Sequence, residues 1–213
     1  MKGAVPGEVS QYPRAGRGAH HVDVALVERG DRRRHAGRFA EEKNLPVLLQ
    51  AFAQLGTPYH LLLIGGARRA RPAANVTMLP YRRDSHELAQ WIASADALVH
   101  AGTKETFGLV ILEAMACGRP VVAARAGAFP EVVDEAVGAL AEPHSAAGMA
   151  EAIASLYERD LDAVGAAARS RVLRHFTWNR AFHAQLATYA SLVGAQRLPV
   201  TDSPILELRS PTS

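Results

Sequence analysis

Cysteine is almost absent from the chain, since Cys117 is the only one and lies within an apolar stretch. A disulfide framework is therefore excluded, and Cys117 is interpreted as a small core residue. Long hydrophobic runs are also lacking, because no stretch approaches the roughly 18–20 uncharged residues of a membrane helix. The first residues have no apolar core of the kind found in a signal peptide. These absences favour a cytoplasmic protein.

Lysine is scarce, occurring only at positions 2, 43 and 104, and the basic side chains are mostly arginine. The formal net charge is +3. Residues 1–36 hold seven Lys or Arg against four acids, and the rest of the chain is neutral overall. The basic excess is therefore confined to the first segment and does not indicate a nucleic-acid-binding face. No nucleic-acid partner is expected.

A chain of 213 residues is long enough for one well-buried domain with tails. Residues 1–36 are rich in Gly, Arg and Pro, and only 22–27 read as a short strand. Strand-like and helix-like segments alternate over residues 37–193. Residues 194–213 contain prolines and Thr/Ser clusters and are interpreted as a C-terminal tail.

The spacing of apolar residues predicts the individual elements. Helices are predicted over 45–55 with Asn44 as cap, around Trp91, over 108–117 and 129–133, around Ile153 with Ser145 as cap, and in two further stretches to about 193. Strands are predicted over 59–64, 76–79, 97–100 and 120–124. Asp160 and Asp162 are interpreted as the acidic start of a helix, and no metal site is predicted.

This alternation predicts an α/β fold, a Rossmann-like doubly wound parallel sheet with helices on both faces. In such sheets ligands bind at the carboxyl ends of the strands. The candidate binding loops are therefore the connections at 65–67, 80–84, 100–108 and 125–130.

The most informative stretch runs from Glu105 to Val122. A helix is predicted to begin near Gly108, and a helix N-terminus suits phosphate or sugar oxygens. Gly108 would let a ligand approach the backbone closely. Glu113 lies in an otherwise apolar helix, and a buried carboxylate needs a partner. A ribose diol is one candidate, and a structural arginine or backbone N–H groups are an equally good alternative.

Five elements in this order resemble one family. They are Gly37 to Asn44 (G-R-x-x-x-x-K-G/N), Tyr59 to Gly66 (a strand with a glycine turn), Glu105 to Val122 (E-x(7)-E followed by A-M-A-x-G-x-P-V-V), Gly127 to Val133 (G-x-x-P-E-V-V) and Phe176 to Trp178 (F-S/T-W). The chain resembles the C-terminal, donor-binding domain of a family 4, GT-B-fold retaining glycosyltransferase (glycosyl transferase group 1). The resemblance covers about residues 37–193.

The resemblance implies a site for a nucleotide sugar. Arg38 and Lys43 would bind the donor diphosphate, for which an arginine fork and a lysine charge are suited. Glu105 would hold hydroxyls of the transferred sugar, and with Arg38 and Lys43 it makes the implied catalytic set. Glu113 would hold the nucleotide ribose. The remaining implied donor contacts are Gly66, Tyr81, Phe107, Gly108 and Leu109.

The implied reaction is transfer of a sugar from GDP-mannose or a UDP-sugar with retention of configuration, without a metal or other cofactor. Two positions depart from the family pattern. Pro80 stands where glycine is usual, beside the loop that would flank the base. His100-Ala101 stands where Pro-Ser is usual. His100 is interpreted first as a strand-end residue and second as a ligand contact.

A GT-B enzyme has two Rossmann-like domains with the active site between them. Residues 1–36 are too few for a second domain and are interpreted as a truncated or altered start. The chain is therefore expected to supply the donor-binding half, with weak or no transfer alone. The alternative is a non-catalytic nucleotide-binding module that needs a partner chain. The acceptor (a glycan, a lipid or a small molecule), peripheral membrane association and homo-oligomer formation stay open.

Overall fold

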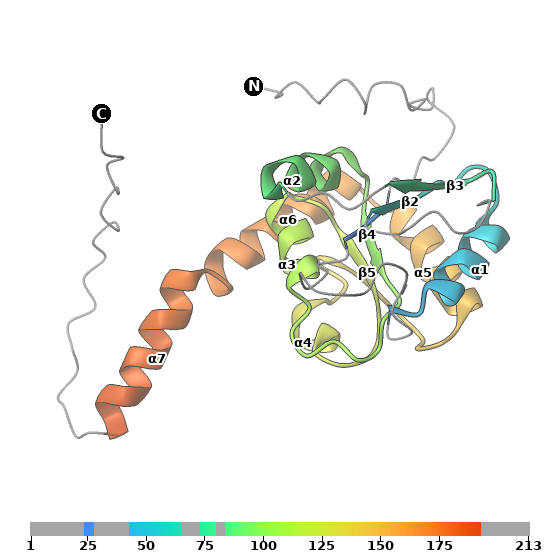
Figure 1. Ribbon diagram of the computed structural model, residues 1–213. Helices are drawn as coiled ribbons and strands as arrows, with labels where there is room; N and C mark the ends of the chain where they lie inside the picture. The colour runs from blue at the N-terminus through green and yellow to red at the C-terminus, as the bar shows by residue number, and fades with distance from the viewer. Residues whose placement is uncertain (1–23, 28–42, 65–72, 80–83, 193–213) are drawn as a thin grey trace, which may run out of the picture. The chain divides into compact units, whose positions relative to one another are not determined.

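The computed structural model describes residues 24–27, 43–64, 73–79 and 84–192. The chain divides into two units, Met1–Arg174 and His175–Ser213. The first unit contains the strands and nearly all of the helices, and the second contains α7 (Trp178–Leu192) (Figure 1). Apart from residues 24–27, the predicted N-terminal segment (1–36) lies outside the described residues, as does the predicted C-terminal tail (194–213).

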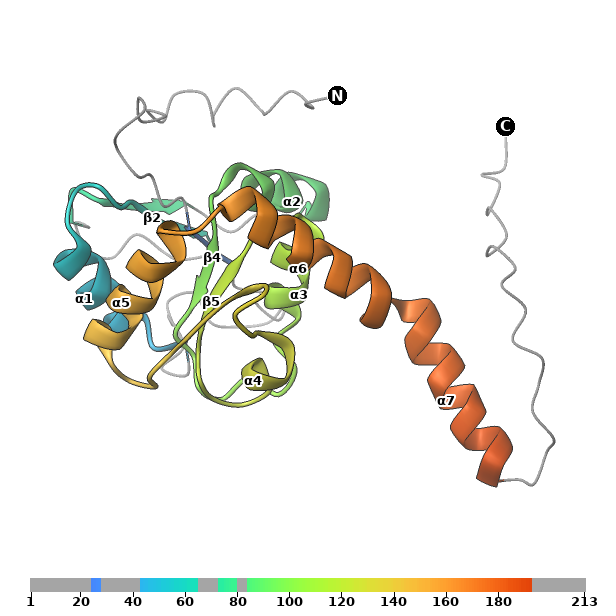
Figure 2. The same cartoon turned by 180° about the vertical axis from the view of Figure 1, so that it is seen from behind.

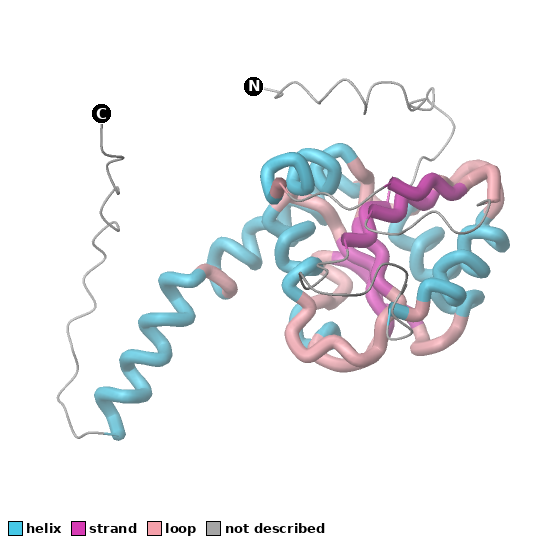
Figure 3. Tube along the Cα trace, viewed as in Figure 1, coloured by secondary structure: helices cyan, strands magenta, loops and turns pink. Residues whose placement is uncertain are grey.

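Short parallel strands form the centre of the first unit (Figure 3). They are β1 (Val24–Val27), β2 (Leu61–Ile64), β3 (Val76–Leu79), β4 (Leu98–His100), β5 (Val121–Ala124) and β6 (Gly138–Ala141). Hydrogen bonds join β1-β2-β3 in one sheet and β4-β5-β6 in the other. Because β1 lies next to β4, the spatial order is β3-β2-β1-β4-β5-β6. This is the strand order of a Rossmann fold.

Helices cover both faces of the strands (Figures 1 and 2). They are α1 (Leu45–Leu55), α2 (Ser85–Ser94), α3 (Leu109–Ala116), α4 (Phe129–Val132), α5 (Ala146–Tyr157) and α6 (Leu161–His175). Helices α1 and α5 pack against each other on one face, and α2 contacts α3 on the other. The doubly wound α/β architecture predicted from the sequence is confirmed.

The core follows from the apolar pattern. β2 and β5 are buried at every position, as expected for strands covered on both faces. Leu48 and Phe52 of α1 recur at helical spacing, and both are fully buried against Met149 and Ile153 of α5. Burial of each such side chain contributes about 1.5–3 kcal/mol relative to exposure. The helix pair α1–α5 is therefore a main part of the hydrophobic core.

Most predicted elements are confirmed within a few residues of their ends, but β6 was missed. Its sequence Gly-Ala-Leu-Ala has little of the branched or aromatic character that signals a strand. Gly138 is needed there, because a side chain would overlap the carbonyl oxygen of Val121 on the neighbouring strand. β1 falls inside the predicted strand at 22–27 and joins the sheet, although it precedes residue 37.

Two of the predicted helix starts are confirmed by their capping hydrogen bonds. The Ser145 hydroxyl accepts from the N–H of Gly148 at 3.0 Å, at the start of α5. The Asp160 carboxylate accepts from the N–H of Ala163 at 3.0 Å, at the start of α6. Each bond satisfies one of the N–H groups that a helix leaves without an internal partner.

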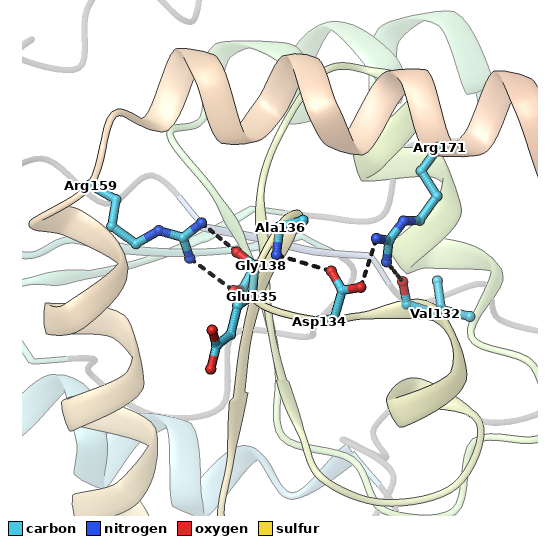
Figure 4. Close-up of polar contacts among 7 residues, drawn as sticks. All are labelled: Val132, Asp134, Glu135, Ala136, Gly138, Arg159 and Arg171. Atoms are coloured by element: carbon cyan, nitrogen blue, oxygen red, sulfur yellow. Dashed lines mark hydrogen bonds and ion pairs between the residues drawn. The ribbon is translucent and has the colours of Figure 1, made fainter.

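Two arginines hold the segment between α4 and β6 (Figure 4). Arg171 of α6 donates to the carbonyl oxygen of Val132 at 3.1 Å and to the Asp134 carboxylate at 2.7 Å. Arg159, which follows α5, donates to the carbonyl oxygen of Gly138 at 3.0 Å. The hydrogen bond from Arg171 lowers the pKa of Asp134. The segment leading into β6 is thus held by α6 and by the connection between α5 and α6.

The second unit is described only by α7. The Thr177 hydroxyl accepts from the N–H of Arg180 at 3.3 Å and so caps the start of this helix. The rings of Trp178 and Phe182 stack one turn apart, with centroids 5.8 Å apart. Among the residues whose placement is given, no helix has both the length and the apolar character to cross a membrane.

A close contact between α6 and the end of α3 gives the first testable prediction. An alanine side chain at Gly165 would overlap the carbonyl oxygen of Gly118. Gly to Ala in a helix interior normally gains about 1 kcal/mol from helix propensity. Here we expect Gly165→Ala to lower the free energy of unfolding by about 1–3 kcal/mol, because the overpacked backbone must shift. Urea unfolding of the purified chain measures this difference.

The control is Ala166→Gly at the neighbouring exposed position of α6. This change should lower stability by about 1 kcal/mol through propensity alone. A stabilised Gly165→Ala variant would show that α6 does not approach Gly118 closely.

Candidate functional site

The carboxyl ends of β1 and β4 define the candidate site. These strands are neighbours, and the helices that follow them along the chain, α1 and α3, lie on opposite faces of the strands (Figure 1). A parallel sheet opens a crevice where successive connections leave in opposite directions, and ligands bind there. The loop from Ala101 to Gly108 leaves β4 at this point and leads directly into α3.

Lys43 and Glu105 meet at this edge. The ammonium group of Lys43, just before α1, forms an ion pair and hydrogen bond with Glu105 Oε1 in the loop after β4. The two side chains are 21% and 25% exposed, so the pair is partly accessible to solvent. The structure thus brings together two of the three residues that the resemblance implies for catalysis. The third, Arg38, lies outside the described residues, as do Gly66 and Tyr81.

Asn44 explains how Lys43 reaches the loop after β4. Its backbone is left-handed, with φ of 48° and ψ of 40°, and its side chain does not cap α1. The predicted N-cap position of Asn44 is thus confirmed, but its side chain makes no capping hydrogen bond to α1. The side-chain amide instead donates to the carbonyl oxygen of Ala101 at 3.1 Å. Because asparagine and glycine tolerate left-handed backbone best, the G/N choice at this position has a structural reason.

His100 lies beneath the ion pair at the end of β4. The side chain is 2% exposed, and its ring packs edge-on against Phe129 with centroids 4.9 Å apart. The N–H of Gly102 donates to Nδ1 at 3.1 Å, and Nε2 lies 3.5 Å from Glu105 Oε1. Burial, followed by the charge of Lys43, lowers the pKa of His100 to about 4. The ring is therefore neutral near pH 7, and its place at the strand end is confirmed.

The charge state of Glu105 follows from the same contacts. Burial acts to raise the pKa of this carboxyl group, but the hydrogen bond and charge of Lys43, with a smaller contribution from His100, outweigh it. The pKa of Glu105 is consequently held below its ordinary value. The site therefore presents one carboxylate, one ammonium group and one neutral imidazole.

Two glycines let the loops of the site pack closely. Gly127 has φ of 56°, and a Cβ atom there would lie 2.5 Å from the carbonyl oxygen of Glu105. Gly108 has φ of 71° and forms the N-cap of α3. A Cβ atom at Gly108 would lie 2.5 Å from the ring of Phe129. The loop before α4 thus packs against the backbone of Glu105, and Phe129 in the first turn of α4 packs against the start of α3.

The remaining implied residues lie on or beside α3. Phe107 and Leu109 are 51% and 48% exposed and flank the helix start. Glu113 is in the middle of α3 and is half-buried, not enclosed as its apolar neighbours suggested. It also has an interaction partner within the chain. The first N–H groups of α3 have no partner within the helix and carry its partial positive charge.

Sequence reasoning missed Phe129 and Gly127 as supports of this site, because it noted them only as parts of a motif. A signal was available in the sequence. Gly127 and Phe129 follow β5. A glycine at such a position indicates that another part of the backbone approaches closely, and a nearby phenylalanine is suited to burial. The contact of Asn44 with Ala101 joins segments far apart in sequence, and no local pattern predicts it.

The strand order defines a Rossmann-like domain. Comparison with known families places it further: the family model described as "Glycosyl transferases group 1" matches residues 34–159, more than half of the chain. The chain belongs to this family of glycosyltransferases.

Curated relatives agree with this assignment. The chain is 35% identical over 172 residues to the GDP-mannose-dependent alpha-(1-6)-phosphatidylinositol dimannoside mannosyltransferase of Mycobacterium tuberculosis, covering 76% of this chain and 45% of the relative. It is 39% identical over 125 residues to D-inositol 3-phosphate glycosyltransferase of an Arthrobacter species, covering 55% of this chain and 30% of the relative. The chain thus spans half or less of the length of these relatives.

Solved structures confirm the fold as one half of a GT-B architecture. Sucrose-phosphate synthase from Thermosynechococcus elongatus superposes with a TM-score of 0.68 at 28% identity, over 84% of this chain and 47% of that one. HepE of Anabaena, solved in complex with UDP-glucose, superposes with a TM-score of 0.61 at 27% identity, over 73% of this chain and 47% of that one.

The ion pair at the site gives a prediction about Glu105. We expect Lys43→Met to raise the pKa of the Glu105 carboxyl group, because the hydrogen bond and positive charge are lost while the burial remains. A carboxyl group with a lowered folded-state pKa stabilises the protein above its unfolded-state pKa, and this contribution is lost as pH falls through the folded value. Lys43→Met should therefore be less stable than wild type near neutral pH, and the difference should shrink in acid.

Carbon-13 NMR titration of the Glu105 carboxyl group measures the change in its pKa. Urea unfolding at several pH values measures the difference in stability between the variant and wild type. Lys43→Arg is the matched control, since it keeps the charge and should keep the Glu105 pKa low. An unchanged Glu105 pKa in Lys43→Met would show that the two side chains are not paired in solution.

Proposed function

We propose that this chain is the donor-binding half of a glycosyltransferase that transfers a sugar from a nucleoside diphosphate sugar with retention and without a metal. The observation that carries the proposal is the Lys43–Glu105 pair at the carboxyl end of β4, immediately before the N-terminus of α3. This arrangement places a cation, a carboxylate and a helix N-terminus at the crevice of a Rossmann-like domain.

The cation and the helix start suit the diphosphate. A departing nucleoside diphosphate gathers negative charge, and fixed positive groups stabilise that charge as it develops. Lys43 supplies an ammonium group, and α3 supplies the backbone N–H group of Leu109 at its N-terminus. Arg38 joins this set through the resemblance of its sequence motif.

The two carboxylates suit the hydroxyl-bearing parts of the donor. An ionised carboxylate accepts hydrogen bonds from adjacent hydroxyls, and such charge-assisted bonds are strong. Glu105 lies in the loop before α3 and is assigned to the transferred sugar. Glu113 lies within α3 and is assigned to the nucleotide ribose.

GDP-mannose is the first candidate donor. The mycobacterial relative is described as GDP-mannose-dependent, and the Glu105-Thr106-Phe107-Gly108 sequence resembles mannosyltransferase-like members of the family. UDP-sugars are the second candidate, since HepE was solved with UDP-glucose. The acceptor would bind mainly to the other half of a GT-B enzyme and is not assigned.

A titration with nucleotides tests the proposal. The purified chain is titrated with GDP, UDP and ADP, and with GDP-mannose and UDP-glucose, by calorimetry. We expect one nucleoside diphosphate to bind. Glu113→Ala should weaken the affinity for that diphosphate and for the corresponding nucleotide sugar by about tenfold, because charge-assisted hydrogen bonds are lost. Glu105→Gln should weaken the nucleotide sugar more than the diphosphate, because Glu105 faces the sugar.

The matched control is Glu151→Ala, which removes an exposed carboxylate on α5 and should change neither affinity. Absence of binding for all five ligands would refute the proposal. Equal losses in Glu113→Ala and Glu151→Ala would refute the ribose assignment.

A further inference from the structure

Two nitrogen atoms approach the same oxygen of Glu105. The Lys43 ammonium group contacts Oε1, and His100 Nε2 lies 3.5 Å from that same atom. Within the described part of the chain, the polar contacts of this carboxylate therefore all fall on Oε1. Oε2 makes none of these contacts with the described residues.

The tautomer of His100 is set by the backbone. The N–H of Gly102 donates to Nδ1, so Nδ1 must be the unprotonated nitrogen. In a neutral ring the proton then resides on Nε2, the atom that faces Glu105. The neutral imidazole therefore offers a hydrogen-bond donor to the carboxylate.

A purely structural role does not account for this nitrogen. The ring is 2% exposed and packs edge-on against Phe129, contacts that an apolar ring would also make. A buried N–H that lacks an acceptor is unfavourable. Among the described residues, Nε2 makes no hydrogen bond of ordinary length, and Glu105 is the acceptor it faces. Hydrogen bonds of this kind are often long in empty sites and shorten when the ligand binds.

We propose that His100 is a positioning residue: its Nε2–H holds Oε1 of Glu105 so that Oε2 faces the hydroxyl groups of the donor sugar. This inference rests on the proposed function, because it assumes that Glu105 binds the sugar of a nucleotide sugar. It adds that a neutral donor beneath the carboxylate fixes its direction, whereas Lys43 approaches from the partly exposed side.

The sharpest test uses two amides of different length. His100→Gln can place an N–H near the position of Nε2 and keep the bond to Glu105. His100→Asn can accept the Gly102 N–H near the position of Nδ1, but it is too short to reach Glu105. Dissociation constants of GDP and GDP-mannose are measured for both variants and for wild type. His86→Asn, an exposed histidine on α2, is the control.

The expected result is a loss of affinity for GDP-mannose with little change in the affinity for GDP. His100→Asn should weaken GDP-mannose by about tenfold while GDP changes by no more than about twofold, and His100→Gln should restore most of the loss. A merely structural role would weaken GDP and GDP-mannose alike. Equal losses for the two ligands, or no loss in His100→Asn, would overturn the proposal.

A measurement without ligand separates this inference from the proposed function. In carbon-13 NMR titrations, His100→Asn should raise the pKa of the Glu105 carboxyl group, and His100→Gln should keep it near the wild-type value. If both variants leave the Glu105 pKa unchanged, His100 does not bond to Glu105 and the inference fails. If wild type binds neither nucleotide while the pKa follows this pattern, the positioning contact stands and the sugar-donor function fails.

Discussion

Parallel pairing of very short strands is the constraint on which this domain depends. Parallel strands of three or four residues must each be joined to the next by a crossing segment, and the carboxyl ends of all of them lie at one edge. Because β1 and β4 are neighbours and their helices leave to opposite faces, that edge opens between them. At this edge the topology brings together residues that are distant in sequence, such as Lys43 and Glu105.

The charge states at the site follow from the close approach of Lys43, Glu105 and His100. Lys43 keeps Glu105 ionised against the effect of burial, and the same positive charge, added to burial, keeps His100 neutral. A neutral imidazole contributes a directional donor without adding a second positive charge. The position of Glu105 in the loop after β4, beside Lys43, therefore decides its charge state, and burial near the same lysine decides that of His100. Gly127 packs against the backbone of Glu105, and Phe129 packs against the ring of His100.

Local patterns predicted most strands and helices, and hence the parallel sheet, because the spacing of apolar residues within short segments such as 61–64 and 45–55 differs between strands and helices. The predicted helix start placed Gly108 among the candidate residues, whereas Lys43 and Glu105 became candidates through the family resemblance. They failed where the cause was not local. β6 is built from small residues that fit against β5, and Asn44 uses its side chain to reach Ala101 instead of capping α1. The direction of Glu105 depended on His100, whose burial only the folded structure reveals.

In the donor site proposed above, the different exposure of Lys43 and His100 gives the two partners of Glu105 different parts. Lys43 is a long, flexible side chain at the rim, and a partly exposed ion pair contributes little net free energy because both charges are also well hydrated. An incoming diphosphate can therefore draw Lys43 toward itself at small cost. His100 is enclosed and cannot turn away, since Gly102 and Phe129 fix its ring. The buried histidine is thus the contact able to keep Glu105 in place when the lysine moves to the phosphate.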